Sequence, residues 1–403
     1  MEIRDVVIVA AVRSAVARGK KDGSLAATHP IDLSAAVMKD AVGRLANTGF
    51  TAAMLDDVLW GCAMPEGSQG LNHARLAVLR AGFPVEVSAA TVNRFCSSGL
   101  QTVAMGAQAI MSGMNDVVLA GGIEMMSQVP MSGYHTRLHP EMTEEMIGMG
   151  FTAERVAQRW GITREQQDAF AADSHKKAAA AIQRGAFKGQ ITPVAVTRTT
   201  WNGPAKSEMS ATFDTDELVR PDTTAEGLGK LKPAFSAKGT VTAGNASPYS
   251  DGAAAVLMMS ADRAKALGVK PLARFVSFAT AGVAPDVMGV GPIKAVPKAL
   301  AKAGVALDAV KLIEFNEAFA AQALAVVKDL GMDLVRTNVN GGAIALGHPL
   351  GATGSKLTAQ LVHELGARGG GLGMVTMYIG GGMGAAGGFE GMAARSEEHT
   401  SEL

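Results

Sequence analysis

The chain has 403 residues, of which 48% are hydrophobic and 18% charged, and its 37 Lys and Arg balance 37 Asp and Glu. This length is enough for two or three domains, and the zero net charge argues against a nucleic-acid-binding or membrane-surface protein. The only two cysteines, Cys62 and Cys96, cannot form a disulfide framework, which indicates a reducing compartment.

The two ends of the chain carry different signals. The N-terminus, Met1–Asp5, lacks the basic start and apolar core of a signal peptide, and no apolar run reaches transmembrane length. We therefore expect a cytoplasmic protein. The last residues, Arg395–Leu403, match what a common sequencing-adaptor DNA encodes in one frame, and we expect them to be a non-native tail.

The first part of the chain alternates strand and helix patterns. Val6–Ala10 is an all-apolar run, typical of a strand buried on both faces. Asp32–Leu45 places its apolar residues on one helical face, and a strand at Val58–Cys62 and a helix at Ser68–Ala81 follow. This alternation predicts a mostly parallel sheet with helices on both faces.

Cys96 lies at a predicted turn between a strand ending at Val92 and a helix over Leu100–Met111. Free N–H groups and the positive dipole end at a helix N-terminus favour a thiolate, so Cys96 is a candidate nucleophile. The alternative is a buried, inert cysteine, which is also how we interpret Cys62. The next strand, Asp116–Ala120, ends at a glycine pair.

The regular alternation stops after this strand. Residues 122–248 are interpreted as an insertion into the first α/β half. Within it, Thr163–Gln166 is a capping-box sequence that predicts a long helix, whereas Thr197–Lys238 is polar and resembles a loop. The apolar strand Ala253–Met259 then returns to the core.

The second half begins near residue 270 and repeats the alternation. Its predicted helices and strands are Ile293–Ala303, Leu312–Phe315, a helix that ends at Gly331, Ser355–Leu365 and Gly373–Ile379. Each half contains a turn or loop, a helix, a strand and a glycine cluster in that order, which indicates an internal duplication.

The late glycines and one histidine are further functional candidates. Gly382-x-Gly384-x-x-Gly387 is not expected to bind a dinucleotide, because that motif must open a helix and precede an acidic residue by about 20 positions. Its exposed N–H groups could instead form an oxyanion hole. His348, in a glycine-rich loop, is either a structural histidine or the base that a cysteine nucleophile requires. No metal-ligand spacing is present.

Five segments, in this order, resemble the signatures of the thiolase family: Asn93–Gly99, Gly121–Ser127, Gly239–Ser247, Asn316–Phe319 and Asn340–Pro349. The resemblance extends over about residues 3–392. It implies an α/β protein with the thiolase-like αβαβα layered fold, built from two similar halves. The N-terminal half would comprise residues 1–121 and 249–269, the inserted loop domain 122–248, and the C-terminal half 270–392.

The resemblance also implies an activity and a site. Cys96 would be the acylated nucleophile, and His348 would activate it and help to hold the thioester oxygen. Asn316 would anchor a water in the same oxyanion hole, and the N–H groups of Cys96 and Gly380 would form a second hole. Ser247 would contact the pantetheine arm of coenzyme A, which is a substrate and not a bound cofactor.

The same resemblance implies a homodimer or homotetramer that acts on acyl-CoA, with a β-oxidation multienzyme complex as a further partner. The segment Asn93–Gly99 is closer to 3-ketoacyl-CoA thiolases than to acetoacetyl-CoA-forming enzymes. Two rivals stay open. One is a non-catalytic acyl-CoA-binding protein or partner subunit, and the other is a ketosynthase-like condensing enzyme, against which Asn316–Phe319 and the long insertion argue.

Tyr378 departs from the family pattern, because it stands where thiolases carry a second catalytic cysteine in a Cys-x-Gly motif. Tyrosine has a reference pKa of about 10 against about 8.5 for cysteine, and its oxygen lies a whole ring beyond Cβ. Three explanations are compatible with this, in order of preference. They are a sequence error or deliberate substitution, a natural protein with impaired or changed chemistry, and an enzyme that uses Tyr378 as its acid.

Overall fold

The computed structural model describes residues 3–142 and 147–394, so the tail Arg395–Leu403 lies outside the described residues. The strands are β1 (Val6–Ser14), β2 (Ala17–Arg18), β3 (Asp57–Cys62), β4 (Ser88–Val92), β5 (Val117–Met125), β6 (Ile191–Thr192), β7 (Val194–Asn202), β8 (Ala205–Phe213), β9 (Ser250–Ser260), β10 (Ala273–Gly282), β11 (Leu312–Phe315), β12 (Gly371–Ile379) and β13 (Met383–Gly391). The helices are α1 (Pro30–Gly43), α2 (His73–Arg80), α3 (Ser98–Met111), α4 (Met149–Trp160), α5 (Arg164–Gln183), α6 (Ala225–Gly229), α7 (Ala261–Ala266), α8 (Gly291–Ala303), α9 (Ala320–Leu330), α10 (Ala343–Leu346) and α11 (Thr353–Ala367).

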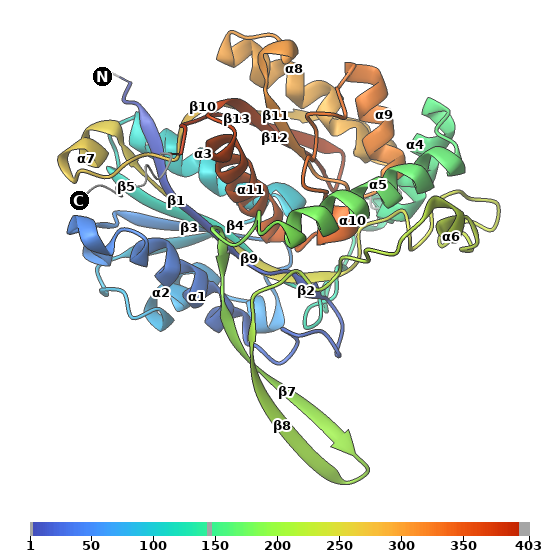
Figure 1. Ribbon diagram of the computed structural model, residues 1–403, viewed down its shortest axis with the longest axis horizontal. Coiled ribbons are helices and arrows are strands. Elements are labelled where there is room, and N and C mark those ends of the chain that lie inside the picture. Colours follow the sequence, from blue (N-terminus) through green and yellow to red (C-terminus); the bar gives the residue numbers. More distant parts are fainter. Residues whose placement is uncertain (1–2, 143–146, 395–403) are drawn as a thin grey trace, which may run out of the picture.

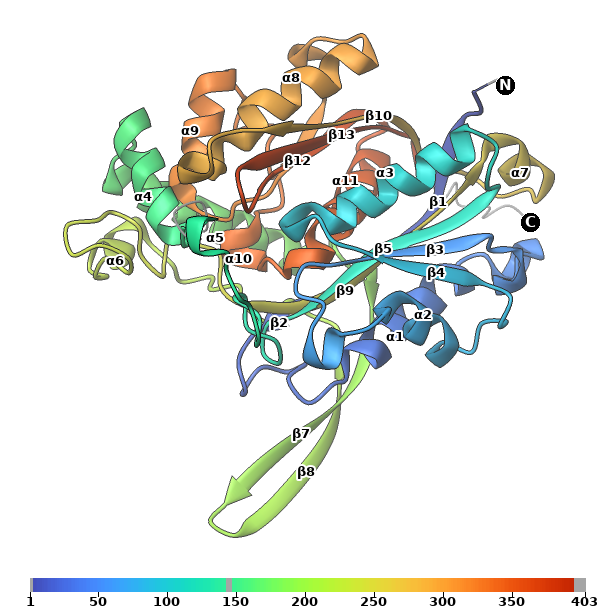
Figure 2. The same ribbon diagram turned by 180° about the vertical axis from the view of Figure 1, so that it is seen from behind.

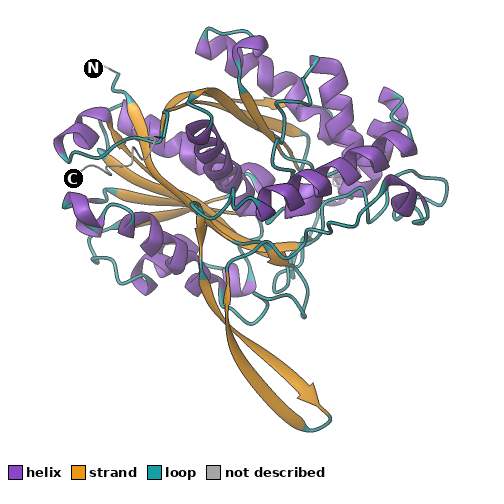
Figure 3. Ribbon diagram, viewed as in Figure 1, coloured by secondary structure: helices purple, strands orange, loops and turns teal. Residues whose placement is uncertain are grey.

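The helices and strands stack in five layers (Figures 1 and 2). The main path of hydrogen-bonded strands runs β11-β12-β13-β10-β1-β9-β5-β3-β4. Helices α3 and α11 lie between its two wings, α1 and α2 cover one outer face, and α8 and α9 cover the other (Figure 3). The predicted αβαβα architecture is therefore confirmed.

Strand β1 joins the two wings and is buried along its whole length. Val7 and Val9 belong to the core under α1 and α2, whereas Val6 and Ile8 belong to the core around α3 and α11. Because successive side chains point to opposite faces, a strand between two helical layers needs apolar residues at every position. This requirement explains the continuous apolar run Val6–Ala10 in the sequence.

The prediction of a mostly parallel sheet is wrong. Parallel pairs occur at the outer parts of the wings, as in β3–β4, β3–β5 and β11–β12, but β1–β9, β5–β9, β10–β13 and β12–β13 are antiparallel. Strand–helix alternation indicates parallel pairing only where a helix connects two neighbouring strands. Here β9 follows the long insertion, and β12 and β13 are joined by a tight glycine turn.

Several predicted boundaries need correction. Thr197–Lys238 is not a plain loop, since β7 and β8 form a hairpin that projects from the body (Figure 1). The side chains of β8 are mostly exposed, so this strand lacks the apolar alternation that identifies a half-buried strand. The predicted helix Ser68–Ala81 is shorter, because Leu71 has a φ of 60° and α2 begins only at His73.

Two strands at the junction of the wings have no counterpart in the sequence prediction, namely β10 and β13. In β13, Gly384 is required because a Cβ there would lie 2.2 Å from the backbone of Gly291 in α8. A strand as rich in glycine and alanine as β13 has low intrinsic β-propensity and is hard to recognise. Strand β10 alternates buried and half-buried residues, including Phe275 and Phe278, and the sequence analysis missed this signal. By contrast, β11 and the capping box at Thr163 are confirmed as predicted.

Helices α3 and α11 approach each other backbone to backbone at their N-termini. A Cβ on Gly354 would lie 2.1 Å from the N atom of Leu100, and a Cβ on Gly99 would lie 2.8 Å from the N atom of Ser355. The Ser355 hydroxyl also donates a hydrogen bond of 2.9 Å to the carbonyl of Gly99. The turn that precedes α3 is thereby held beside the loop that precedes α11.

Gly354→Ala tests this contact. The added methyl group would meet backbone atoms that cannot move independently, so we expect a loss of at least about 1–3 kcal/mol in the free energy of unfolding, measured by urea denaturation. Gly366→Ala in the same helix is the matched control, because its nearest atom would be 3.4 Å away. It should be neutral or stabilising by up to about 1 kcal/mol. Equal stability of the two variants would contradict the proposed close contact.

Candidate active site

Cys96 lies in a 3-10 turn, Phe95–Ser97, between β4 and α3. The side chain of Asn93 accepts a hydrogen bond of 2.8 Å from the Phe95 N–H, and Phe95 has a φ of 44°, in the left-handed region. The Ser98 hydroxyl accepts from the Arg94 N–H at 2.9 Å and donates to the Phe95 carbonyl at 2.7 Å. These local bonds close a sharp turn that places the sulfur just before the helix N-terminus.

The expectation of a low pKa at Cys96 is wrong for the free protein. Burial raises the pKa of Cys96 to about 12, although the backbone N–H of Gly380 and that of Cys96 itself act in the opposite direction. The negative charge of Glu124 raises the pKa further. Desolvation therefore outweighs the helix N-terminus, and Cys96 rests as a thiol that needs a base. Cys62 is also buried, as predicted, and burial raises its pKa well above the ordinary value.

His348 is buried and held at both ring nitrogens. Its Nδ1 lies 2.6 Å from the hydroxyl of Thr353, and that hydroxyl donates its single proton to the carbonyl of Pro349 at 2.9 Å. The hydroxyl must therefore accept from Nδ1–H, which leaves the lone pair on Nε2. Burial, with a smaller effect of Lys356, lowers the pKa of His348 to about 3. The ring is thus neutral and able to take a proton at Nε2.

Asn316 immediately follows β11 and is completely buried. Its Nδ2 lies 3.4 Å from the Nε2 atom of His348. Its Oδ1 has no hydrogen-bond partner among the described protein groups. A buried carbonyl oxygen without a protein partner is costly, and a bound water would satisfy it.

The third wall of the site comes from the end of β12. A Cβ on Gly380 would lie 3.6 Å from the Phe95 ring, so Gly380 faces the Cys96 turn. Tyr378, two residues earlier, is buried in a cluster with Met288 and Ala318. Its hydroxyl lies 3.7 Å from the sulfur of Met149, a weak acceptor.

Burial raises the pKa of Tyr378 well above its ordinary value, and repulsion between a phenolate here and the thiolate form of the neighbouring Cys96 acts in the same direction. A phenol in this state holds its proton at neutral pH. It is therefore poorly suited to remove a proton from a substrate carbon.

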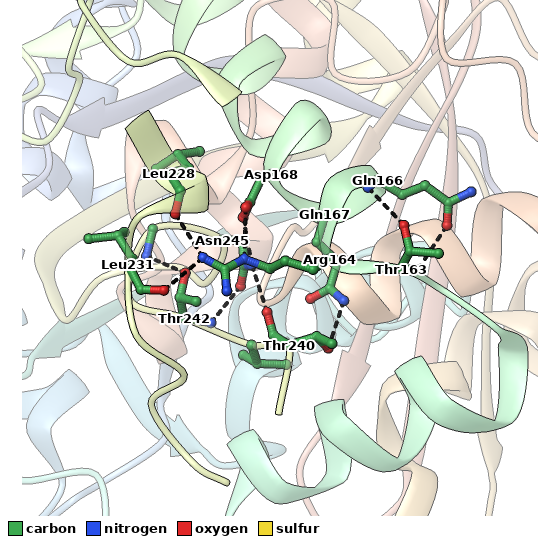
Figure 4. A network of polar contacts seen from close by, with 12 residues as sticks. Thr163, Arg164, Gln166, Gln167, Asp168, Leu228, Leu231, Thr240, Thr242 and Asn245 are labelled. Carbon is green, nitrogen blue, oxygen red and sulfur yellow. Dashed lines mark hydrogen bonds and ion pairs between the residues drawn. The ribbon is translucent and has the colours of Figure 1, made fainter. Parts of the chain in front are cut away.

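A polar network surrounds Asn245, two residues before Ser247 (Figure 4). Arg164, at the start of α5, donates to Asp168 at 2.7 Å and to the carbonyls of Leu228 and Leu231. Asp168 accepts at 3.0 Å from Asn245, whose side chain also binds the backbone of residues 240 and 242. The network fixes the turn that leads into Ser247.

This turn is joined directly to the segment after β11. The Ser247 N–H donates to the carbonyl of Ala318 at 2.9 Å, and the Ala320 N–H donates to the carbonyl of Asn245 at 2.9 Å. Ser247 is half-buried. The structure therefore connects it, through Ala318, to the region of Asn316.

The predicted residues form two linked groups. His348 and Asn316 contact each other, while Cys96, Gly380 and Tyr378 surround the turn before α3. Leu350, two residues after His348, packs in the same apolar cluster as Cys96. Within the described residues, Cys96 and His348 share no direct hydrogen bond. Sequence reasoning missed Thr353 and Ser250, whose hydroxyls bind the ring and the N–H of His348.

Two kinds of feature are absent from residues 3–142 and 147–394. No group of three or more His, Cys, Asp or Glu side chains is arranged to hold a metal ion. No helix in these ranges is long and apolar enough to cross a membrane.

Comparison with known proteins gives a consistent result. The family model "Thiolase, N-terminal domain" matches residues 6–262, and "Thiolase, C-terminal domain" matches residues 269–390. The chain is 52% identical over 393 residues to the 3-ketoacyl-CoA thiolase of Bacillus subtilis, covering 96% of this chain and 100% of that protein. It is 50% identical over 400 residues to the acetyl-CoA acetyltransferase of Pseudomonas aeruginosa, covering 95% and 98%.

Solved structures agree with the sequence matches. The crystal structure of the Bacillus anthracis acetyl-CoA acetyltransferase superposes with a TM-score of 0.85 at 40% identity, covering 97% of this chain and 100% of that chain. Human mitochondrial 3-ketoacyl-CoA thiolase gives a TM-score of 0.85 at 39% identity, covering 96% and 99%.

Proposed function

The chain belongs to the thiolase family, and from this premise we propose that Cys96 carries an acyl group between molecules of coenzyme A. The protein is a thiolase-type acyltransferase, since full-length relatives at about half identity carry that activity in their names. The observation that supports the roles of individual residues is the neutral His348, in which the Thr353 hydroxyl fixes the proton on Nδ1 and the lone pair on Nε2.

The proposed reaction is the cleavage of a 3-ketoacyl-CoA by a second CoA. The sulfur of Cys96 attacks the 3-keto carbon while its proton passes to Nε2 of His348. The resulting oxyanion is held by fixed donors, and the C2–C3 bond then breaks. The leaving carbon takes one proton, which balances the proton that Cys96 gave up, to give acetyl-CoA, and the shortened acyl group stays on Cys96. CoA then attacks this thioester, and its thiol proton passes to the departing sulfur, which restores the Cys96 thiol.

The two oxyanion holes are assigned as proposals. One consists of His348 with a water on the unpartnered oxygen of Asn316. The other consists of the N–H groups of Cys96 and Gly380, and the position of Gly380 opposite the turn supports it. Ser247, fixed by the Asn245 network, is proposed to contact the pantetheine arm.

A catalytically impaired acyl-CoA-binding protein is the second candidate, and Tyr378 is the observation that favours it. The proton that must reach the leaving carbon has no evident donor, because the phenol faces Met149. Formation of the acyl-enzyme from acetyl-CoA does not need that proton. The match to both thiolase models favours either candidate over a ketosynthase-like enzyme.

We also propose a substrate class, a metabolic setting and a location. We propose 3-ketoacyl-CoA as the substrate class, following the Bacillus subtilis relative, and a β-oxidation complex as the setting. We propose a cytoplasmic location because both cysteines are free thiols.

We also propose that a second copy of the chain covers the β4 edge of the sheet. Strand β4 ends the strand order, and an open edge strand is a template for pairing. Leu71, close to this edge in the segment before α2, is 87% exposed. Large exposed apolar residues next to a free edge are typical of an interface.

The oligomer prediction is tested by light scattering coupled to size exclusion. We expect a mass of twice or four times the 41.4 kDa chain. Leu71→Lys should shift the protein toward the single chain, because a charge would be buried at the interface. Met209→Lys, on the exposed hairpin, is the control for the β4 interface and should keep at least the dimer. A parent that elutes as a single chain would refute the interface.

The proposed nucleophile is tested by intact-mass and peptide mass spectrometry after mixing with acetyl-CoA. We expect one acetyl adduct, on the peptide that contains Cys96, because the second cysteine, Cys62, is buried beside a carboxylate. Cys96→Ala should abolish the adduct. An adduct on Cys62, or one that persists in Cys96→Ala, would show that the assignment is wrong.

Tyr378→Cys separates the two candidates. A positioned acid/base contributes ~10²–10⁴-fold, so the variant should raise the thiolysis rate of acetoacetyl-CoA by at least about 100-fold. The burst of Cys96 acetylation should change much less. Tyr378→Phe is the control, since it keeps the ring and removes only the hydroxyl, and its thiolysis rate should match the parent. Equal and substantial thiolysis by the parent and by Tyr378→Cys would assign the acid/base role to another group.

A further inference from the structure

Glu124 is a buried carboxylate that the proposed chemistry does not use. It lies near the end of β5, behind the glycine pair that precedes it, and is 1% exposed. Its Oε2 accepts from the N–H of Ala63 at 2.9 Å and of Gly351 at 2.8 Å. Its Oε1 accepts from the N–H of Met64 at 3.2 Å and from the amide of Gln69 at 2.8 Å.

All four of these partners are N–H donors. In a protonated carboxyl, the O–H would point at one of these N–H donors and lose a hydrogen bond. The four hydrogen bonds therefore favour the ionised form of Glu124. They act against burial, which raises the pKa of Glu124. The titratable groups that face the carboxylate are Cys62, with its sulfur 4.0 Å away, and Cys96. An ionised group with four charge-assisted bonds is a firm anchor.

The hydrogen bond from Ala63 connects Glu124 to Cys96, the proposed nucleophile. Ala63 follows β3, and its carbonyl accepts a hydrogen bond of 3.1 Å from the side chain of Asn93. The oxygen of the same side chain accepts from the N–H of Phe95, the residue before Cys96. Two side-chain links therefore connect Glu124 to the turn that presents the sulfur.

The hydrogen bond from Gly351 connects Glu124 to His348, the proposed base. Gly351 is three residues after His348, in the short segment between the histidine and α11. The space there is tight, because a Cβ on Gly351 would lie 2.7 Å from the Cα of Cys62 and 2.6 Å from the carbonyl of Ile123. The Gly351 N–H can therefore bind the carboxylate only while the backbone of Gly351 stays packed against Cys62 and Ile123.

We propose that Glu124 is a positioning residue that holds the Cys96 turn and the His348 loop in register by binding both through one carboxylate. This inference rests on the proposed function, in which the sulfur and the imidazole must act together. The two segments are 252 positions apart in sequence, as the numbers 96 and 348 show, and share no direct hydrogen bond within the described residues. Glu124 touches neither reacting atom and acts through the backbone.

Glu124→Gln is the first test, because it keeps the size and removes the charge. In either orientation the amide places an NH₂ group against two N–H donors. We expect the rate of Cys96 acetylation by acetyl-CoA to fall about 10- to 100-fold. Loss of the nearby negative charge should also lower the pKa of Cys96, so its alkylation by iodoacetamide, mapped to the Cys96 peptide, should shift to lower pH. A purely structural role would not produce slower acetylation together with easier alkylation.

Two further variants separate the effect of the position of the Glu124 carboxylate from the effect of its charge. Glu124→Asp keeps the charge but is one methylene shorter, so acetylation should slow while the alkylation profile stays near that of the parent. Asn93→Ala breaks only the link from Ala63 to Phe95, and it should slow acetylation without shifting the profile. Asp216→Asn is the matched control: this other buried carboxylate binds Arg13 and the Val16 N–H, and its loss should lower the melting temperature alone.

The outcomes discriminate. Acetylation of Glu124→Gln at the parental rate overturns the inference, and so does an equal slowing in Asp216→Asn. If neither Glu124 variant folds, parental acetylation of Asn93→Ala overturns it. If the parent itself is alkylated at Cys96 but never acetylated, the proposed function fails. In that case an unshifted alkylation profile in Glu124→Gln overturns the link between Glu124 and Cys96 as well.

Discussion

The whole site depends on the backbone contact between the N-termini of α3 and α11. Without side chains at Gly99 and Gly354, the two helices meet at a separation that no other residue permits. Each helix is preceded by a segment that holds a proposed site residue, Cys96 or His348, and each comes from a different half of the chain. The central layer therefore converts two similar halves into one site in which a cysteine from the first faces groups from the second.

This arrangement buries Cys96 and His348, and burial changes the pKa values of both side chains. Cys96 and His348 are both neutral at rest, because desolvation raises the pKa of the thiol and lowers that of the imidazole. Neither group alone would be reactive in this state. In the proposed reaction, charge develops only as the proton moves from sulfur to nitrogen, which is the situation in which preorganised donors are most effective. The N–H of Gly380 and a water on the Oδ1 atom of Asn316 would be these donors.

The layered fold could be predicted because five segments of the sequence resemble thiolase signatures, while local apolar runs such as Val6–Ala10 located individual strands. The roles of Cys96 and His348 stay predictions. The pairing directions were not predictable, since β10 and β13 consist of residues whose role is set by neighbours distant in sequence. The raised pKa of Cys96 was also missed, because burial depends on tertiary packing. Thr353 could have been found: it lies five residues after His348, within reach of the ring through one helical turn.

The environment of Tyr378 shows how one side chain at the proposed site contributes to packing. Its ring packs against Met288 and Ala318, and its hydroxyl reaches Met149 of α4, so it ties the end of β12 to the inserted segment. A cysteine there would leave a void where the ring now sits, and cavities in a packed core are destabilising. A functional acid/base at this position needs open space for substrate, whereas tyrosine fills that space with favourable contacts. Filling space in this way stabilises the fold at the position where the proposed chemistry would need room for substrate, which is a common conflict between stability and activity.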